Sequence, residues 1–84
     1  MNKADIKIGK LYRTVEYDIE YMSTFKPGSI VLVLDYYRGS AMVAQLIFGE
    51  LADFKAVKST YRVDTKHGTC YTVLCAELEE LQGD

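Results

Sequence analysis

Two short apolar runs on either side of a turn constrain this chain more than any other feature of its sequence. The runs are Ser29–Leu34 and Ala41–Phe48. The first is rich in β-branched residues and apolar at consecutive positions, which suits a central strand covered on both sides. The segment Asp35–Ser40 between the runs is predicted to turn, with Arg38 and Gly39 at its tip. We therefore place these two strands in the middle of the core.

A third strand is predicted before these runs, where apolar and polar residues alternate from Leu11 to Ile19. Leu11, Val15 and Tyr17 share one parity, and Tyr12 falls on the polar parity with Thr14 and Glu16. Because side chains of a strand alternate between its faces, this pattern places Leu11 and Tyr17 inward and Tyr12 outward.

The C-terminal half predicts a hairpin followed by a helical turn. Alternation resumes from Phe54 to Thr65, and the compact turn Lys66–Gly68 makes Tyr61–Cys75 a hairpin, with the glycine supplying a positive φ. The segment Ala76–Leu81 has leucines three residues apart and three glutamates, which favours a short helix or 3₁₀ turn.

Composition limits the class of protein. The chain has 84 residues, of which 49% are hydrophobic and 26% charged, so a single packed domain over residues 1–84 is expected. Its net charge of -2 argues against a surface that clamps nucleic acid on all sides. No apolar run reaches the length of a signal peptide or a membrane span, so we expect a cytoplasmic protein without a membrane partner.

Together these elements predict a mainly β fold: a small five-stranded antiparallel barrel with a short C-terminal helical turn. From Lys10 to Leu81 the order of elements resembles the Src-homology-3-like small barrel. In both, a long loop and a turn such as Lys26-Pro27-Gly28 introduce a hydrophobic strand. The resemblance lies in architecture, since the chain has no tryptophan and no Ala-Leu-Tyr-Asp-Tyr or Ser-Asn-Tyr segment. It implies a fold and no particular function.

The two cysteines, Cys70 and Cys75, lie five residues apart in one predicted strand. An odd separation directs them to opposite faces, which argues against a disulfide or a shared metal site. We expect one thiol in the core and the other nearer the surface or under the terminal turn, and the alternation leaves open which is which. Both should act as small hydrophobic residues.

Residues suited to catalysis are sparse. The single histidine, His67, is predicted at the tip of a turn, where a neighbouring thiol is not dependably activated. The carboxylate pairs Asp18 with Glu20 and Glu50 with Asp53 are interpreted as solvated loop edges. The six glycines are widely separated and form no phosphate-binding run. We therefore predict no catalytic residues, no cofactor and no metal site.

Tyrosine is the residue type that points to a function, because the chain contains seven. Tyr17, Tyr61 and Tyr71 have parities that suit the core. The remaining four, Tyr12, Tyr21, Tyr36 and Tyr37, are candidates for an exposed cluster. Surface tyrosine offers a large contact area with a polar group, so the leading hypothesis is a protein-binding module, such as a small regulatory or inhibitory protein of phage or accessory type. Aromatic capping of the open ends of a barrel is the structural alternative.

A second hypothesis uses a local basic stretch made of Lys55, Lys58, Arg62 and Lys66. These side chains could contact nucleic-acid phosphates while a tyrosine at position 36 or 37 stacks on an unpaired base. They equally suit an edge strand, where lysine prevents unwanted pairing.

A homodimer is a further expectation, because the two apolar runs offer more hydrophobic surface than one small barrel encloses.

Overall fold

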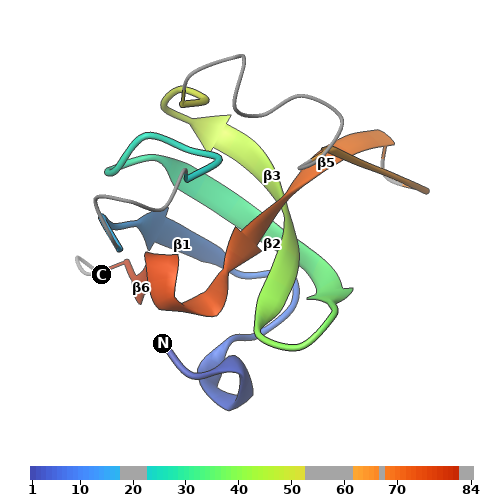
Figure 1. Ribbon diagram of the computed structural model, residues 1–84, viewed down its shortest axis with the longest axis horizontal. Coiled ribbons are helices and arrows are strands. Elements are labelled where there is room, and N and C mark those ends of the chain that lie inside the picture. The colour runs from blue at the N-terminus through green and yellow to red at the C-terminus, as the bar shows by residue number, and fades with distance from the viewer. Residues whose placement is uncertain (18–22, 53–61, 67, 82–84) are drawn as a thin grey trace.

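The computed structural model describes residues 1–17, 23–52, 62–66 and 68–81, whose strands form one antiparallel sheet (Figure 1). Six strands are present in these ranges, in the order β4-β5-β3-β2-β1-β6. They are β1 (Leu11–Thr14), β2 (Ile30–Tyr37), β3 (Ala41–Phe48), β4 (Arg62–Thr65), β5 (Gly68–Leu74) and β6 (Leu78–Glu80). Two 3₁₀ helices, η1 (Lys3–Asp5) and η2 (Cys75–Glu77), complete the described elements.

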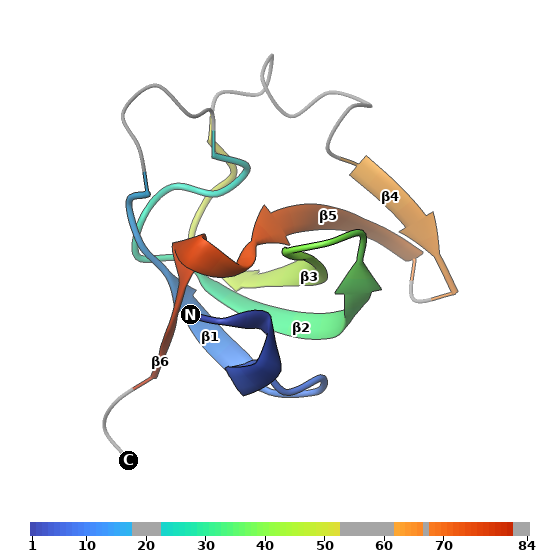
Figure 2. The same ribbon diagram turned by 60° about the horizontal axis from the view of Figure 1, so that its bottom comes forward.

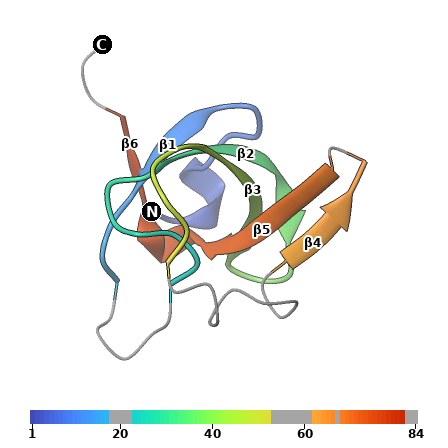
Figure 3. The ribbon, with the colours of Figure 1, turned by 90° about the horizontal axis from the view of Figure 1, so that it is seen from above.

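The sheet is strongly curled but open. The register between β2 and β3 shifts twice, between Ile30 and Val31 and between Val33 and Asp35, and such bulges bend a strand and increase its twist. Figure 3 shows β1, β2 and β3 curving around the interior. The edges of this sheet are β4 and β6, which lie on opposite sides of the molecule (Figure 2). The mainly β antiparallel architecture is therefore confirmed, but the sheet has six strands instead of the predicted five and is not a closed barrel.

The central hairpin has the predicted strands with a shorter turn. β3 has the predicted bounds, and β2 continues through Tyr37 because it keeps pairing with β3 as far as Tyr37 opposite Ala41. The turn is consequently limited to residues 38–40, with Gly39 at a φ of 59°. Tyr36 and Tyr37 thus belong to a strand and not to the turn in which the sequence pattern placed them.

The C-terminal region also differs from its prediction in part. β4 and β5 form the expected hairpin, with Thr65 opposite Gly68. The predicted helical turn starts one residue earlier, as η2, and is followed by β6. β6 pairs with β1, Glu79 lying opposite Arg13, so backbone hydrogen bonding to β1 replaces the helical turn that the leucine spacing suggested.

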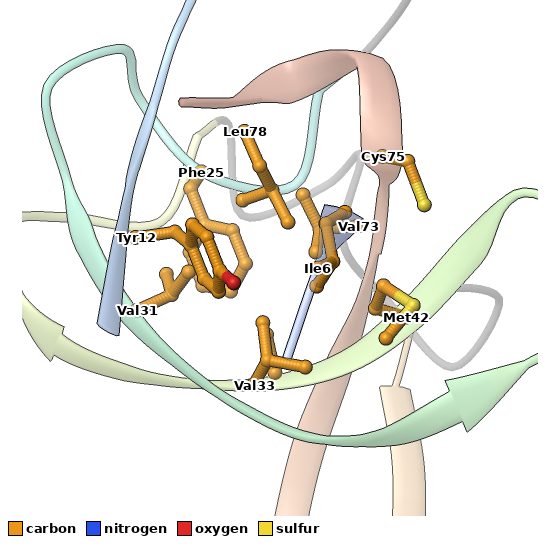
Figure 4. Close-up of a cluster of buried hydrophobic side chains, with 10 residues drawn as sticks. Ile6, Tyr12, Phe25, Val31, Val33, Met42, Val73, Cys75 and Leu78 are labelled. Atoms are coloured by element: carbon orange, nitrogen blue, oxygen red, sulfur yellow. The ribbon is translucent and has the colours of Figure 1, made fainter. Parts of the chain in front are cut away.

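The core fills the concave side of the sheet, where side chains from β1, β2, β3 and β5 converge (Figure 4). The side chain of Tyr12 is fully buried and lies opposite Val31, while its neighbour Leu11 is 39% exposed and Tyr17 is 51% exposed. The predicted orientation of this strand is therefore reversed. Tyr12 tolerates burial because its hydroxyl accepts a hydrogen bond of 2.7 Å from the backbone N–H of Lys7.

Segments outside the strands close the core. Ile6, which follows η1, and Phe25, in the loop before β2, are each 2% exposed and pack with the strand residues (Figure 4). The ring of Phe25 meets that of Tyr71 edge to face, with centroids 6.0 Å apart. The N-terminal ammonium of Met1 donates to the carbonyl oxygens of Cys75 and Leu78, at 3.0 and 3.4 Å. These contacts tie the start of the chain to η2.

Both cysteines are buried, with exposed fractions of 0% for Cys70 and 2% for Cys75. Of the two positions expected for the second thiol, the one nearer the surface is wrong, whereas burial at the terminal turn agrees with the position of Cys75 in η2. β5 ends at Leu74 and Cys75 begins η2, so strand alternation does not extend to the second thiol. Within the described ranges, no helix has the length and apolar character needed to cross a membrane.

Candidate protein-binding face

The convex side of β1, β2 and β3 carries apolar side chains that face away from the core. Leu11 lies opposite Leu32, and on the next row Arg13 lies opposite Ile30, which in turn lies opposite Phe48. Ile30 and Leu32 are half-buried, whereas Phe48 is 71% exposed. We call the surface formed by Leu11, Ile30, Leu32, Ile47 and Phe48 the outer apolar face.

A bulge produces the most exposed part of this face. Val31 is paired with Leu46 and Ile30 with Phe48, so Ile47 is an extra residue on β3. Leu46 packs against the core, while Ile47 is 51% exposed beside Phe48. A bulge interrupts the regular alternation of faces and redirects side chains. Two consecutive large apolar residues are therefore presented to solvent.

Gly49 fixes the backbone directly after Phe48. Its φ of 117° is disfavoured for residues with a Cβ, and a Cβ built at this position would approach the Cβ and Cα of Ser29 to 2.7 and 2.8 Å. Ser29 is itself held, since its hydroxyl donates to the carbonyl of Lys26 at 2.7 Å and its N–H donates to the Thr14 hydroxyl at 3.0 Å. The end of β3 therefore abuts a rigid, hydrogen-bonded support.

Two ion pairs of the described residues border the outer apolar face. Arg13 and Glu79 lie on the row of Ile30 and Phe48, with nitrogen and oxygen 3.3 Å apart. Beyond Phe48, the ammonium of Lys26 lies 2.7 Å from the carboxylate of Glu50. Each pair is neutral as a unit, so the border of the face carries opposite charges in balance. A third pair, Lys10 with Glu80 at 3.6 Å, belongs to the other side of the sheet, because Glu80 lies opposite the buried Tyr12 and the Lys10 ammonium lies 5.6 Å from the centre of the Tyr12 ring.

The Lys26–Glu50 pair shifts the titration of both groups. The hydrogen bond from Lys26, followed by its positive charge, lowers the pKa of Glu50 below the usual 4.5. The same contacts raise the pKa of Lys26 above 10.5. Both side chains are exposed to solvent, where screening keeps the stabilisation small.

The predicted tyrosine cluster is not assembled as proposed. Tyr12 is buried in the core, so its assignment to a binding surface is wrong. Tyr21 lies outside the described residues. Tyr36 is 49% exposed near the end of β2, and the adjacent Tyr37 is half-buried with the Arg38 guanidinium 5.6 Å from its ring centre. A binding role for Tyr36 and Tyr37 stays a prediction.

The basic stretch is described in part. Lys55 and Lys58 lie outside the described residues, Arg62 begins β4 and the exposed Lys66 follows it. β4 is an edge strand of the described sheet, which fits the alternative reading of these residues as edge protection. Contact with nucleic acid stays a prediction.

The other candidate residues form no described catalytic group. His67, Asp18, Glu20 and Asp53 lie outside the described residues, and Glu50 is paired with Lys26. In the part of the chain that is described, no cluster of three or more His, Cys, Asp or Glu could hold a metal ion. Sequence reasoning expected surplus apolar surface from the two central runs but did not identify the residues of the outer apolar face, although three consecutive large apolar residues before Gly49 depart from strand alternation and could have indicated them.

Comparison with known proteins does not add a family to this description. No protein-family model, no curated protein and no solved structure matches the chain.

Proposed function

We propose that this chain is a non-enzymatic protein-binding module that docks its partner on the outer apolar face. The observation that carries the proposal is the exposure of Phe48 (71%) and Ile47 (51%) side by side on a sheet face. Adjacent large apolar residues that stay exposed on an otherwise packed domain are characteristic of interaction sites. An aromatic side chain at the centre of an interface is also a frequent energetic hot spot.

The energy available from this face is substantial. Complete burial of a phenylalanine or isoleucine side chain contributes about 1.5–3 kcal/mol each. A partner that covers both residues, together with Leu11, gains this energy without needing to remodel the sheet. The hydrogen-bonded support around Ser29 holds the end of β3, which limits the ordering entropy that binding would cost.

The chemistry of the face favours protein over nucleic acid. Phosphate recognition needs cations that are free to replace counterions. Arg13, the cation on the row of Ile30 and Phe48, is already paired with Glu79. A protein surface that offers apolar side chains at its centre and polar groups at its rim is the better match.

Site-specific photo-crosslinking tests this proposal. Benzoylphenylalanine is placed at position 48, at position 36 to test the tyrosine hypothesis, and at the exposed position 7 as a control, and each protein is irradiated in a lysate of its native host. We expect a discrete protein adduct from position 48, absent from position 7 and lost when Leu11→Ser and Ile47→Ser are added to a chain that stays folded.

Equal labelling from positions 48 and 7 would contradict the proposal. A discrete adduct from position 36 alone would transfer the binding site to the Tyr36–Tyr37 region.

A further inference from the structure

We infer that the outer apolar face is covered by a second copy of this chain, so that the protein forms a two-fold symmetric homodimer. This inference rests on the proposed function and names its partner. A two-fold interface sets the same patch of both copies against each other, and the patch must therefore be complementary to itself. Three features of the face satisfy this requirement.

The first feature is charge. A face with a net charge would repel its own copy, whereas each ion pair around the outer apolar face is neutral: Arg13 with Glu79, and Lys26 with Glu50. All of these side chains are at least 41% exposed, so they remain at the rim with access to water. Across a two-fold axis, a cation of one copy can pair with the carboxylate of the other copy and the reverse, so that no charge is left unpaired.

The second feature is the polar residue within the apolar rows. Gln45 is exposed and lies opposite Leu32, which is opposite Leu11. A primary amide both donates and accepts hydrogen bonds, so a glutamine can pair with polar groups of an identical surface. A carboxylate or an ammonium at this position would instead meet its own charge.

The third feature is the location of the face in the sheet. Its residues lie on β1, β2 and β3, each of which has strand neighbours on both sides. In the described residues β5 pairs with β3 only from Ala41 to Ala44, so the part of the face that has paired strands on both sides is formed by β1 and β2, and a second copy covers this part by stacking sheet on sheet.

Sedimentation velocity over a concentration series tests the inference with a matched pair of variants. Phe48→Glu places a charge at the centre of the face, and Tyr36→Glu places the same charge on a 49% exposed aromatic residue near the other end of β2. The wild type and Tyr36→Glu should rise from 9.5 kDa toward twice that mass as concentration increases. Phe48→Glu should remain at 9.5 kDa, with a dimer dissociation constant raised by about 100-fold or more.

Two results would overturn the inference: a wild type that stays at 9.5 kDa throughout, or a dimer that Phe48→Glu leaves intact or weakens no more than Tyr36→Glu does. The circular dichroism of each variant confirms that it is folded. The photo-crosslinking experiment separates the two proposals. An adduct from position 48 to a different protein, with a monomeric wild type, keeps the proposed function and removes the homodimer, whereas the absence of any position-48 adduct contradicts the proposed function.

Discussion

Tyr12 and Phe48 are aromatic residues of the same curled sheet, and they lie on opposite faces of it. Tyr12 on β1 is fully buried, with its hydroxyl bonded to the backbone of Lys7, whereas Phe48 on β3 is 71% exposed. The concave face therefore holds the more polar aromatic side chain, and the convex face holds the more apolar one.

The two faces of the sheet use their apolar side chains differently. The concave face collects Tyr12, Val31, Val33 and Met42 with residues from outside the strands, and its contacts stabilise the fold. The convex face leaves Ile47 and Phe48 open to solvent, where they contribute little to folding and remain available to a partner. Mutations on the two faces should therefore affect different measurements.

The largest effect is expected from Tyr12→Ala. Removal of this ring leaves a cavity among the core residues and should lower the free energy of unfolding by about 3–5 kcal/mol. Phe48→Ala, an aromatic truncation on the exposed face, should change it by no more than about 0.5 kcal/mol. Urea denaturation followed by circular dichroism, at a protein concentration low enough to keep the chain monomeric, measures both.

Tyr12→Phe keeps this comparison informative if Tyr12→Ala does not fold. It retains the ring but removes the acceptor for the N–H of Lys7, so a loss of about 1 kcal/mol is expected. Similar losses for Tyr12→Ala and Phe48→Ala would show that the two faces are not energetically distinct.

An intermediate loss of stability is expected from Gly49→Ala, where the end of β3 packs against the hydrogen-bonded segment around Ser29. Strain at a φ of 117° and the contact with Ser29 should together cost about 2–3 kcal/mol. Gly28→Ala is the matched control, because Gly28 has a φ of 92° with nothing within 4 Å of the added Cβ, and should cost about 1 kcal/mol. Thermal and urea unfolding measure both variants, and equal losses would mean that the approach to Ser29 has no energetic consequence.

The smallest effect is expected from the Lys26–Glu50 pair at the rim. Because the folded-state pKa of Glu50 is lowered, its contribution to stability is present above pH 4.5 and is lost as the pH falls through the folded value. Because the pKa of Lys26 is raised, its contribution is present below pH 10.5 and is lost as the pH rises through its folded value. Glu50→Gln should therefore differ slightly from the wild type at neutral pH and converge with it in acid.

Unfolding of both proteins at pH 7 and pH 2.5, each in low and high salt, tests this pair. Salt should shrink the difference at pH 7, since exposed charges are screened. A difference that persists in acid would show that Glu50 stabilises the fold by some means other than its charge.

Local pattern predicted the elements of this fold better than their orientation. β3 and the hairpin of β4 and β5 follow from apolar runs and turn residues near one another in sequence. The orientation of β1 did not follow, because both parities of this strand carry residues able to occupy a core. Tyr12 could be buried once Lys7 supplied a donor, and that contact comes from a turn outside the strand.

The candidate site was less accessible to sequence reasoning than the fold. Of the four tyrosines proposed as a surface, Tyr12 lies in the core and Tyr36 is exposed. The outer apolar face depends on a bulge at Ile47, whose position is set by the pairing of β3 with β2. A residue count within β3 alone assigns alternate faces to Ile47 and Phe48, and therefore misses the surface that they share.

The sequence by itself determined that this chain forms short antiparallel strands, because β-branched apolar runs, alternation and turn residues act over a few neighbouring positions. It also determined the balance of charges that leaves the protein weakly acidic. Only the tertiary structure decided that η2 leads into a strand on the edge of β1, that both thiols are buried, and that Phe48 faces solvent. These outcomes depend on strand pairing and bulges between segments far apart in the chain. The burial and contacts of each residue there are set by residues distant in the sequence.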